Sequence, residues 1–234
     1  MEIKGNDKYK DIVELFESLV GSRSMWQVYS DVIKMIACAL QNSIIFNEKI
    51  ETIFKDTAKE YNEKEREIID KIYYKIVSKL EENPFQDLLG DLYMNLEMGS
   101  DALGQFFTPY HISKTMAKAA IDIDYVKKKI DEEGYVKLYE PTSGSGSTVI
   151  AACEILKNEG INYQRKCVFV CQELNKITAL MCYIALSLIG CSAVVKIDDT
   201  LTESFSNYKN EAYAKKSDLW TTPMFWLYSG YNKV

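Results

Sequence analysis

The chain has 234 residues, of which 47% are hydrophobic, so it is long enough to bury one sizeable core or two small ones. Its net charge of −6 argues against a free-standing nucleic-acid binder, because affinity for phosphates depends on an excess of lysine and arginine. The N-terminus lacks the apolar core of a signal peptide, and no apolar run is long enough to span a bilayer. We therefore predict a soluble, cytoplasmic protein that makes no membrane contact.

The chain has six cysteines and a single histidine, His111. Most of the cysteines lie inside apolar runs and none forms a Cys-x-x-Cys pair, which predicts buried thiols in a reducing compartment. Cys167 and Cys171 do not combine with His111 in any spacing typical of zinc. We expect no metal site.

The first hundred residues are predicted to be helical. From Tyr9 to about Gly99 the apolar residues recur at intervals of three and four, and the stretch is poor in the alternating patterns typical of strands. Gly21 and Ser22 separate the first two predicted helices, and Asn83-Pro84 is expected to start a later one. We assign residues 1–100 to an N-terminal helical domain.

A turn of two aromatic residues, Phe106–Pro109, comes next. Thr108 is a good N-cap and Pro109 a good first helical residue, which predicts that a helix carrying Ile112, Met116 and Ala119 begins here. The free N–H groups of such a helix start can hold a carboxylate, for example that of a methionine moiety. Alternatively, the two phenylalanines are a hydrophobic staple and nothing more.

The central feature is a loop of small residues. The apolar run Lys137–Tyr139 leads into the loop Glu140–Ser147, and helical spacing follows at once, as in the first strand-loop-helix step of a nucleotide-binding sheet. Gly144 and Gly146 allow the backbone to approach a ligand closely, and Ser147 is a candidate N-cap for the next helix. The pattern indicates a cofactor loop, although a lone Gly-x-Gly can also be a plain flexible connection.

Three kinds of cofactor use such a loop. A phosphate-binding P-loop needs a lysine, and none stands between Lys137 and Lys157. A dinucleotide fingerprint needs a third glycine, where this chain has Val149. Glu140 and Pro141 ahead of the glycines suit a cationic cofactor without a pyrophosphate, and S-adenosylmethionine fits best.

Two further predicted strands end in acids. The apolar run Cys167–Glu173 is typical of a buried parallel strand, and an acid at that place in the sheet accepts hydrogen bonds from ribose hydroxyls. A predicted helix, Asn175–Leu188, connects it to a third strand, Ala193–Asp199, whose terminal acids are placed to accept from an adenine amino group. A fourth predicted strand, Asp218–Trp226, runs into an aromatic turn.

Four motifs occur in a set order: Gly104–Pro109, Glu140–Gly146 with its Glu-Pro-x-x-Gly-x-Gly pattern, Gln172–Asn175 and Asp199–Leu201. With these motifs the chain resembles the modification (M) subunit of type I restriction-modification systems, the adenine-N6 DNA methyltransferase family. The resemblance is close from about residue 85 to residue 201, and the helical region before it is similar to the N-terminal domain of that family.

The resemblance implies a cofactor site made of Phe107, Thr108, Glu140, Pro141, Gly144, Gly146, Glu173 and Asp199. Phe107 and Thr108 would contact the methionine end of S-adenosylmethionine, with the glycine loop beneath it. Glu173 would bind the ribose and Asp199 the adenine of the cofactor.

The resemblance also implies a catalytic turn. In the family an Asn/Asp-Pro-Pro-Phe/Tyr turn accepts the amino hydrogens of a flipped adenine and stacks an aromatic ring on it. The matching stretch here is Thr222–Phe225, in which Thr222, Pro223 and Phe225 would be the catalytic residues. Threonine lacks the carbonyl acceptor of the family's first residue, and Met224 replaces the second proline.

We therefore predict an α/β protein with a helical domain over residues 1–100 and, over residues 101–234, the cofactor-binding half of a truncated, doubly wound Rossmann-like methyltransferase sheet. The expected function is S-adenosylmethionine binding by a protein of the adenine-N6 DNA methyltransferase type that is weak or inactive alone. One alternative is an active methyltransferase whose site is completed by partner chains; another is an α/β domain that binds a different nucleotide. The expected partners are other restriction-modification subunits and, together with them, DNA.

Overall fold

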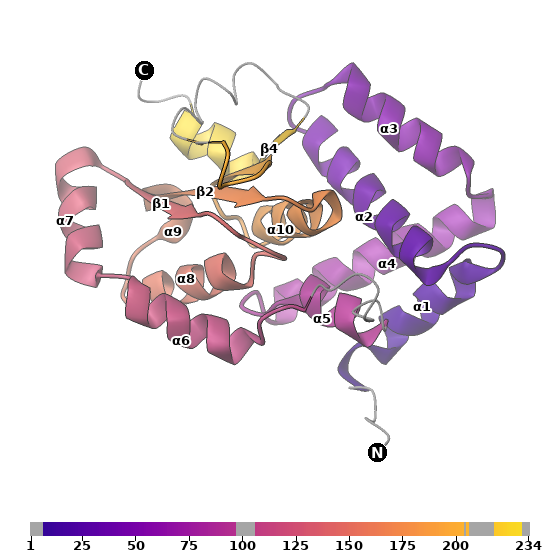
Figure 1. Cartoon of the computed structure of the whole chain (residues 1–234), viewed down its shortest axis with the longest axis horizontal. Helices are drawn as coiled ribbons and strands as arrows, with labels where there is room; N and C mark the ends of the chain where they lie inside the picture. The colour runs from indigo at the N-terminus through magenta and orange to yellow at the C-terminus, as the bar shows by residue number, and fades with distance from the viewer. Residues whose placement is uncertain (1–6, 97–105, 204, 206–217, 231–234) are drawn as a thin grey trace.

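The computed structural model describes residues 7–96, 106–203, 205 and 218–230 (Figure 1). Gly99, near the predicted end of the helical region, and Gly104 and Gln105, which begin the first motif, lie outside the described residues. In the view of Figure 1 the early helices form the right-hand part of the molecule, and the sheet with its helices forms the left-hand part.

The N-terminal part of the chain is helical, as predicted. Its elements are η1 (Asp7–Tyr9), α1 (Lys10–Val20), α2 (Met25–Asn42), α3 (Glu48–Lys59), α4 (Glu63–Glu82) and α5 (Leu88–Asn95). Gly21 ends α1 with a positive φ of 48°, in agreement with the predicted break. The predicted helix start at Asn83 is wrong, because Asn83 caps the end of α4. The next helix, α5, begins at Leu88 after Asp87, whose carboxylate accepts a hydrogen bond from the backbone N–H of Gly90.

The second part alternates helices and strands. Its elements are α6 (Tyr110–Ala120), α7 (Ile123–Glu133), β1 (Val136–Glu140), α8 (Ser147–Asn158), α9 (Tyr163–Lys166), β2 (Cys167–Glu173), α10 (Lys176–Leu188), β3 (Ala193–Ile197), β4 (Leu219–Thr221) and a π-helical turn, η2 (Phe225–Gly230). The predicted strand over residues 167–173 is confirmed at both of its ends. The predicted helix after it is confirmed with Asn175 as its N-cap.

The four strands form one sheet in the order β1-β2-β3-β4. The first three strands are parallel, with Glu140 paired to Cys171 and Glu173 paired to Ile197. Their carboxyl ends therefore meet at one edge of the sheet. Strand β4 is antiparallel to β3, so it runs back toward the amino ends of the other three strands.

The two faces of the sheet are covered differently. Phe169 and Cys171 face the main core, whereas the alternate residues Val168 and Val170 pack in a second, smaller cluster with Phe225. Because the first three strands follow each other in order and such crossovers are right-handed, α8 and α10 lie on the same face. The predicted class, a helical region followed by a Rossmann-like half-sheet, is confirmed. Because α8 and α10 lie on the same face, the described strands are wound in one direction only and do not form the doubly wound sheet that was predicted.

One main core joins both parts of the molecule. Helix α2 packs against α10, and buried side chains of the early helices and of the sheet belong to the same cluster. The six cysteines are buried free thiols, as predicted. Within the described residues no helix is both long and apolar enough to cross a membrane.

Candidate functional site

The glycine loop connects the end of β1 to the start of α8. Gly144 has φ +55° and Gly146 has φ +98°, a left-handed conformation that side chains other than glycine adopt only with strain. Gly146 is the residue that precedes α8, so the prediction that Ser147 is its N-cap is wrong. Ser147 is instead the first helical residue, and its hydroxyl donates to Ser113 Oγ at 2.9 Å.

The two loop glycines have different neighbours. A Cβ atom on Gly146 would lie 3.2 Å from Cys182 Sγ and 3.4 Å from Cys182 Cα, so this glycine allows α8 and α10 to approach each other. A Cβ atom on Gly144 would meet only the ring of Phe107, at 3.9 Å. Gly146 is thus needed for packing, whereas Gly144 faces open space.

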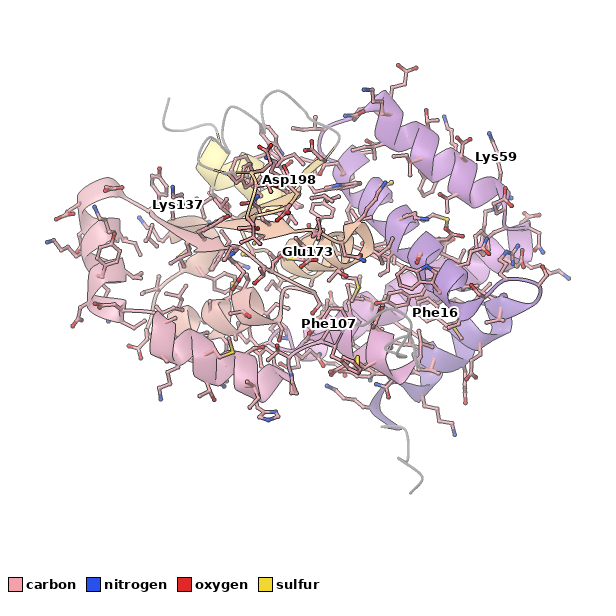
Figure 2. All side chains as sticks on the ribbon, in the orientation of Figure 1. Phe16, Lys59, Phe107, Lys137, Glu173 and Asp198 are labelled. Carbon is pink, nitrogen blue, oxygen red and sulfur yellow. The ribbon has the colours of Figure 1, made fainter. Side chains whose placement is uncertain are left out.

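That space is a hollow of about 210 Å³, lined by Phe106, Phe107, Thr108, Thr142, Ser143, Gly144, Ser145, Ser147, Thr148, Glu173 and Thr178. It brings together four of the predicted cofactor residues: Phe107, Thr108, Gly144 and Glu173. Figure 2 shows Phe107 and Glu173 in the middle of the molecule, where the sheet meets the early helices. None of the described residues that line the hollow is lysine or arginine.

Glu173 is the main charged group of this hollow. One of its carboxylate oxygens accepts from the Gly144 N–H at 3.0 Å, and the other accepts from the Asn175 N–H at 2.9 Å. A carboxylate can accept about four hydrogen bonds, so two positions stay open for a ligand. The Glu173 side chain is half-buried, which leaves those positions accessible from the hollow.

Ser143 supplies a second acceptor or donor. Its hydroxyl oxygen is buried in the wall of the hollow and has no hydrogen-bond partner among the described residues. A buried polar atom without a partner costs free energy, which a ligand group can recover. The Glu173 carboxylate and the Ser143 hydroxyl therefore fit a polar ligand that carries hydroxyl or amino groups and no phosphate.

Glu140 and Pro141 lie beside this hollow. Glu140 lines an adjoining space of about 170 Å³ between α6 and β1, and Thr148 borders both spaces. Burial raises the pKa of the Glu140 carboxyl, which accepts a hydrogen bond from the Thr142 N–H at 3.3 Å. The carbonyl of Pro141 accepts a hydrogen bond from the Thr200 hydroxyl and so ties the ends of β1 and β3 together.

The acids at the end of β3 differ from each other. Asp198 forms an ion pair with Lys196 at 3.0 Å, and the strand is extended by a hydrogen bond from the Asp198 N–H to the Glu173 carbonyl. The Asp199 carboxylate accepts a local hydrogen bond from the Leu201 N–H, at 2.9 Å. Of the two, Asp199 stays the one predicted to contact adenine.

Sequence reasoning assigned no role to two exposed leucines in this part of the molecule. Leu174 follows Glu173 directly and is 70% exposed, and Leu201 follows Asp199 by two residues and is 95% exposed. Large apolar side chains with this exposure beside strand-ending acids can pack against a planar ring. The signal in the sequence was their position one or two residues after the acids.

The helix after the Phe-Phe-Thr-Pro turn differs from its prediction. It begins at Tyr110 after Pro109 and has no side-chain cap, so Thr108 is not the N-cap. Its buried residues are Ser113 and Ala117, whereas the predicted apolar residues Ile112 and Met116 are exposed. The small side chains let α8 pack closely on this helix, and that contact decides which face is buried.

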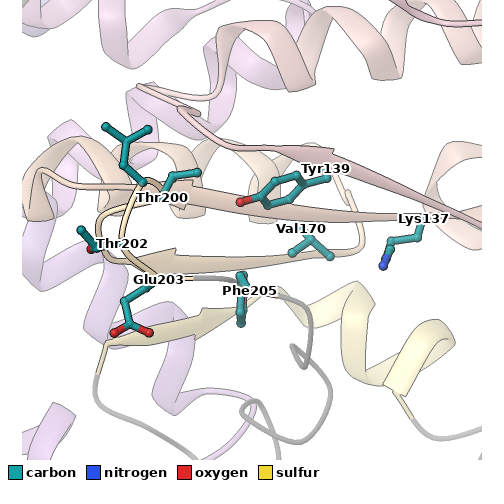
Figure 3. Close-up of a pocket in the computed structure, with 8 residues that line it drawn as sticks. Lys137, Tyr139, Val170, Thr200, Thr202, Glu203 and Phe205 are labelled. Atoms are coloured by element: carbon teal, nitrogen blue, oxygen red, sulfur yellow. The ribbon is translucent and has the colours of Figure 1, made fainter.

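A larger hollow, of about 530 Å³, lies on the other face of the sheet (Figure 3). Tyr139 and Val170, which are paired across β1 and β2, line it together with Phe205. It contains none of the predicted cofactor residues, and the glycine loop does not line it. Despite its size, it is the weaker candidate because it lacks the groups of the glycine loop.

The predicted catalytic residue Thr222 lies at the opposite end of the sheet. Its hydroxyl is fully buried, donates to the Cys191 carbonyl at 2.7 Å and accepts from the Ala193 N–H at 2.8 Å. Ala193 is the first residue of β3, whereas the cofactor acids follow its last residue. With a rise of about 3.3 Å per residue, the five residues of β3 put roughly 13 Å of strand between the two ends.

The other two predicted catalytic residues share this location. Phe225 is fully buried in the second cluster, against Val168 and Val170, so its ring is not available to stack on a base. Pro223 is half-buried in the same turn. The structure therefore does not bring Thr222, Pro223 and Phe225 to the glycine loop, and this arrangement does not favour catalytic roles for them.

Comparison with known proteins gives one family. The family model described as N-6 DNA methylase matches residues 85–222, more than half of the chain. We found no match among curated proteins. Methyl transfer from S-adenosylmethionine is the chemistry of this family, so the match implies use of that cofactor.

Two matches among solved structures are reported as methyltransferases, one of them putative. The methyltransferase subunit of a type I restriction-modification system from Streptococcus thermophilus is 22% identical, with a TM-score of 0.43 over 85% of this chain and 40% of that one. A putative class I S-adenosylmethionine-dependent methyltransferase from Listeria monocytogenes is 11% identical, with a TM-score of 0.38 over 94% of this chain and 69% of that one. This chain therefore spans 40% of the length of the S. thermophilus subunit. By its sequence match, the chain belongs to the N-6 DNA methylase family.

Proposed function

We propose that this chain binds S-adenosylmethionine in the hollow between the glycine loop and Glu173, as the cofactor-binding half of an adenine-N6 DNA methyltransferase. The observation that carries the proposal is the pairing of Glu173 with the Gly144 N–H in a cation-free hollow. A carboxylate held at the end of a strand beside a glycine loop accepts ribose hydroxyls, and the absence of lysine and arginine from the described lining disfavours phosphates.

The remaining residues suit the other parts of this cofactor. Phe107 and Thr108 also line the hollow and would contact the methionine moiety. Glu140, in the adjoining space, would attract the sulfonium charge. Asp199 would accept from the adenine amino group while Leu174 packs against the ring.

We further propose that the chain alone transfers methyl groups poorly or not at all. An adenine amino group is a weak nucleophile, and the preorganised acceptors that activate it typically contribute about a hundredfold to a thousandfold in rate. In this chain the buried hydroxyl of Thr222 already donates to the Cys191 carbonyl and accepts from the Ala193 N–H. It has no acceptor to offer to a base held at the other end of the sheet.

An assisted enzyme is the second candidate. Glu173 is half-buried and Gly144 faces the hollow, so the carboxyl edge of the sheet is open. A partner subunit that docks at this edge would reach a cofactor bound there. DNA would then be held mainly by that partner, because the net charge of −6 disfavours phosphate binding by this chain.

The test combines calorimetry and an activity assay. S-adenosylmethionine and S-adenosylhomocysteine should both bind, whereas ATP and NAD should not compete. Labelled methyl transfer to adenine-rich duplex and single-stranded DNA should stay at background with the chain alone. Robust transfer by the chain alone contradicts the proposal of an inactive half, and absence of binding contradicts the cofactor site. Transfer that appears only with added restriction-modification subunits supports the assisted enzyme.

A further inference from the structure

Asp87 connects the early helices to the glycine loop. It is 3% exposed and precedes α5, where one carboxylate oxygen accepts from the Gly90 N–H at 3.0 Å. The other oxygen accepts from the Ser145 hydroxyl at 2.6 Å. Ser145 stands between Gly144 and Gly146, so a buried side chain from α5 bonds the middle of the loop directly.

A charge in this place is costly. Among the described residues Asp87 has no ion pair with lysine or arginine, and the nearby carboxylate of Asp91 repels it. Burial is the main cause that raises the pKa of Asp87, to about 6. Capping alone does not require this charge, because asparagine and serine cap helices about as well as aspartate.

Gly90 is a second sign that the carboxylate has a fixed place. A Cβ atom at this position would lie 2.3 Å from Asp87 Oδ2 and 2.7 Å from Asp87 Cγ. Glycine inside a helix costs about 1 kcal/mol relative to alanine. Helix α5 therefore accommodates the Asp87 carboxylate at the expense of its own stability.

Besides the bond to Asp87, hydrogen bonds of the Ser143, Gly144 and Gly146 N–H groups restrain the loop. Gly144 and Gly146 both have positive φ angles, and glycine lets the backbone leave such a conformation easily. Ser145, between them, is held from outside by Asp87. In this conformation the Gly144 N–H points to Glu173 and the Gly146 N–H bonds to the Ser143 carbonyl at 2.8 Å. The contacts thus run from α5 through the loop to the proposed ribose-binding carboxylate.

We propose that Asp87 is a positioning residue for the cofactor: through Ser145 it holds the glycine loop in its binding conformation, so that α5 sets the affinity of the site. This inference rests on the proposed function for its ligand. Its effect on the loop is present without a ligand, which allows the two to be tested separately.

The first measurement is residue-resolved amide hydrogen exchange of the ligand-free full chain. Asp87→Ser keeps a good N-cap but is too short to reach Ser145, and Ser145→Ala removes the other end of the same bond. Both variants should exchange the Gly144 and Gly146 amides faster than the unmodified protein. Asp91→Asn, on the same helix and without contact to the loop, is the matched control and should leave these rates unchanged.

The second measurement is calorimetry with S-adenosylmethionine. Losing one charge-assisted hydrogen bond that holds the loop should weaken binding by about tenfold in either variant. The double variant should bind no more weakly than the single ones, because both remove the same bond. Additive losses indicate separate structural effects and overturn the inference.

The outcomes separate the two proposals. Unchanged exchange at Gly144 and Gly146 in Ser145→Ala overturns the inference even if Asp87→Ser does not fold. If the unmodified chain does not bind S-adenosylmethionine, the proposed function fails, while the exchange rates still decide whether Asp87 holds the loop.

Discussion

The two ends of the sheet are built for opposite purposes. At the carboxyl ends of the parallel strands, the half-buried Glu173 has unused acceptor positions, Gly144 faces a hollow and Ser143 has a buried hydroxyl without a partner. At the amino end of β3, the hydroxyl of Thr222 is fully buried and bonded to the backbone on both sides. One end leaves polar groups available, and the other satisfies them.

The difference separates ligand binding from stability. Polar groups left open, and the buried charge of Asp87 beneath them, lower the stability of the carboxyl end. The hydrogen bonds of Thr222 contribute to the stability of the amino end. This distribution suits the proposed cofactor site at the carboxyl end, whereas Thr222 and Phe225 of the Thr-Pro-Met-Phe turn are buried.

Gly144→Val should have the largest effect and abolish binding of S-adenosylmethionine, a loss of more than about a hundredfold. The side chain would enter the hollow, and a β-branched residue is strained at φ +55°. Gly160→Val is the matched control, since Gly160 has φ +76°, a Cβ atom there would meet no described residue beyond its chain neighbours within 4 Å, and Gly160 does not line the hollow. It should lose a similar amount of stability and bind normally. Equal affinity of the two variants in calorimetry would contradict the assignment of the loop.

Asp87→Asn should change how stability depends on pH. The pKa of Asp87 is about 6 in the folded protein and 3.8 ordinarily, so the folded state binds the Asp87 proton more tightly than the unfolded state does. The resulting stabilisation is fully present below pH 3.8 and is lost as pH rises through 6. The loss is at most about 3 kcal/mol. Asparagine does not titrate, so the free energy of unfolding of the variant should rise relative to that of the parent between pH of about 4 and about 7. Urea unfolding across this range is the measurement, and parallel curves for the two proteins would show that Asp87 is not the cause.

Glu173→Ala should weaken binding by about tenfold to a hundredfold, because two charge-assisted bonds to ribose hydroxyls are lost. Glu203→Ala is the control, since Glu203 is also an acid that follows β3 but borders the larger hollow instead. The affinities are compared by calorimetry. A liganded structure in which the ribose lies away from Glu173 would also refute this role.

Thr222→Val should lower the free energy of unfolding by about 1–2 kcal/mol and leave cofactor affinity unchanged. The substitution keeps the shape but leaves the Ala193 N–H and the Cys191 carbonyl without the hydroxyl. Thr222→Asn, which restores the side-chain carbonyl of the family, should not produce methyl transfer, since it lies at the wrong end of the sheet. Transfer gained by Thr222→Asn in the labelled-methyl assay would show that this turn does reach the cofactor.

Glu140→Gln should have the smallest effect, a two- to threefold weaker binding of S-adenosylmethionine by an order-of-magnitude Coulomb estimate for a half-buried charge. Binding of the uncharged S-adenosylhomocysteine should stay the same, because the lost attraction concerns the sulfonium charge. The ratio of the two affinities is the measured quantity. A ratio that does not change would place the sulfonium away from Glu140.

Much of the carboxyl end could be predicted from local patterns. The strand over residues 167–173, its terminal acid and the helix after it were found from one apolar run and one capping asparagine. Leu174 and Leu201 received no role, because an isolated apolar residue in a loop has no periodic signal. The helix α6 was predicted, but the spacing of its residues does not tell which face is buried, and only the close approach of α8 selects Ser113 and Ala117.

The sequence by itself determined the order of elements, the glycine loop and the acids that end the strands, since these depend on residues within about one turn or one strand of each other. Only the tertiary structure decided that β4 runs antiparallel to β3 and that α5 holds the loop. The deciding contacts join residues far apart in the chain: Thr222 bonds to Ala193, Asp87 to Ser145 and Thr221 to Gln41. No local pattern encodes such pairings, because each depends on which distant surface is buried against it.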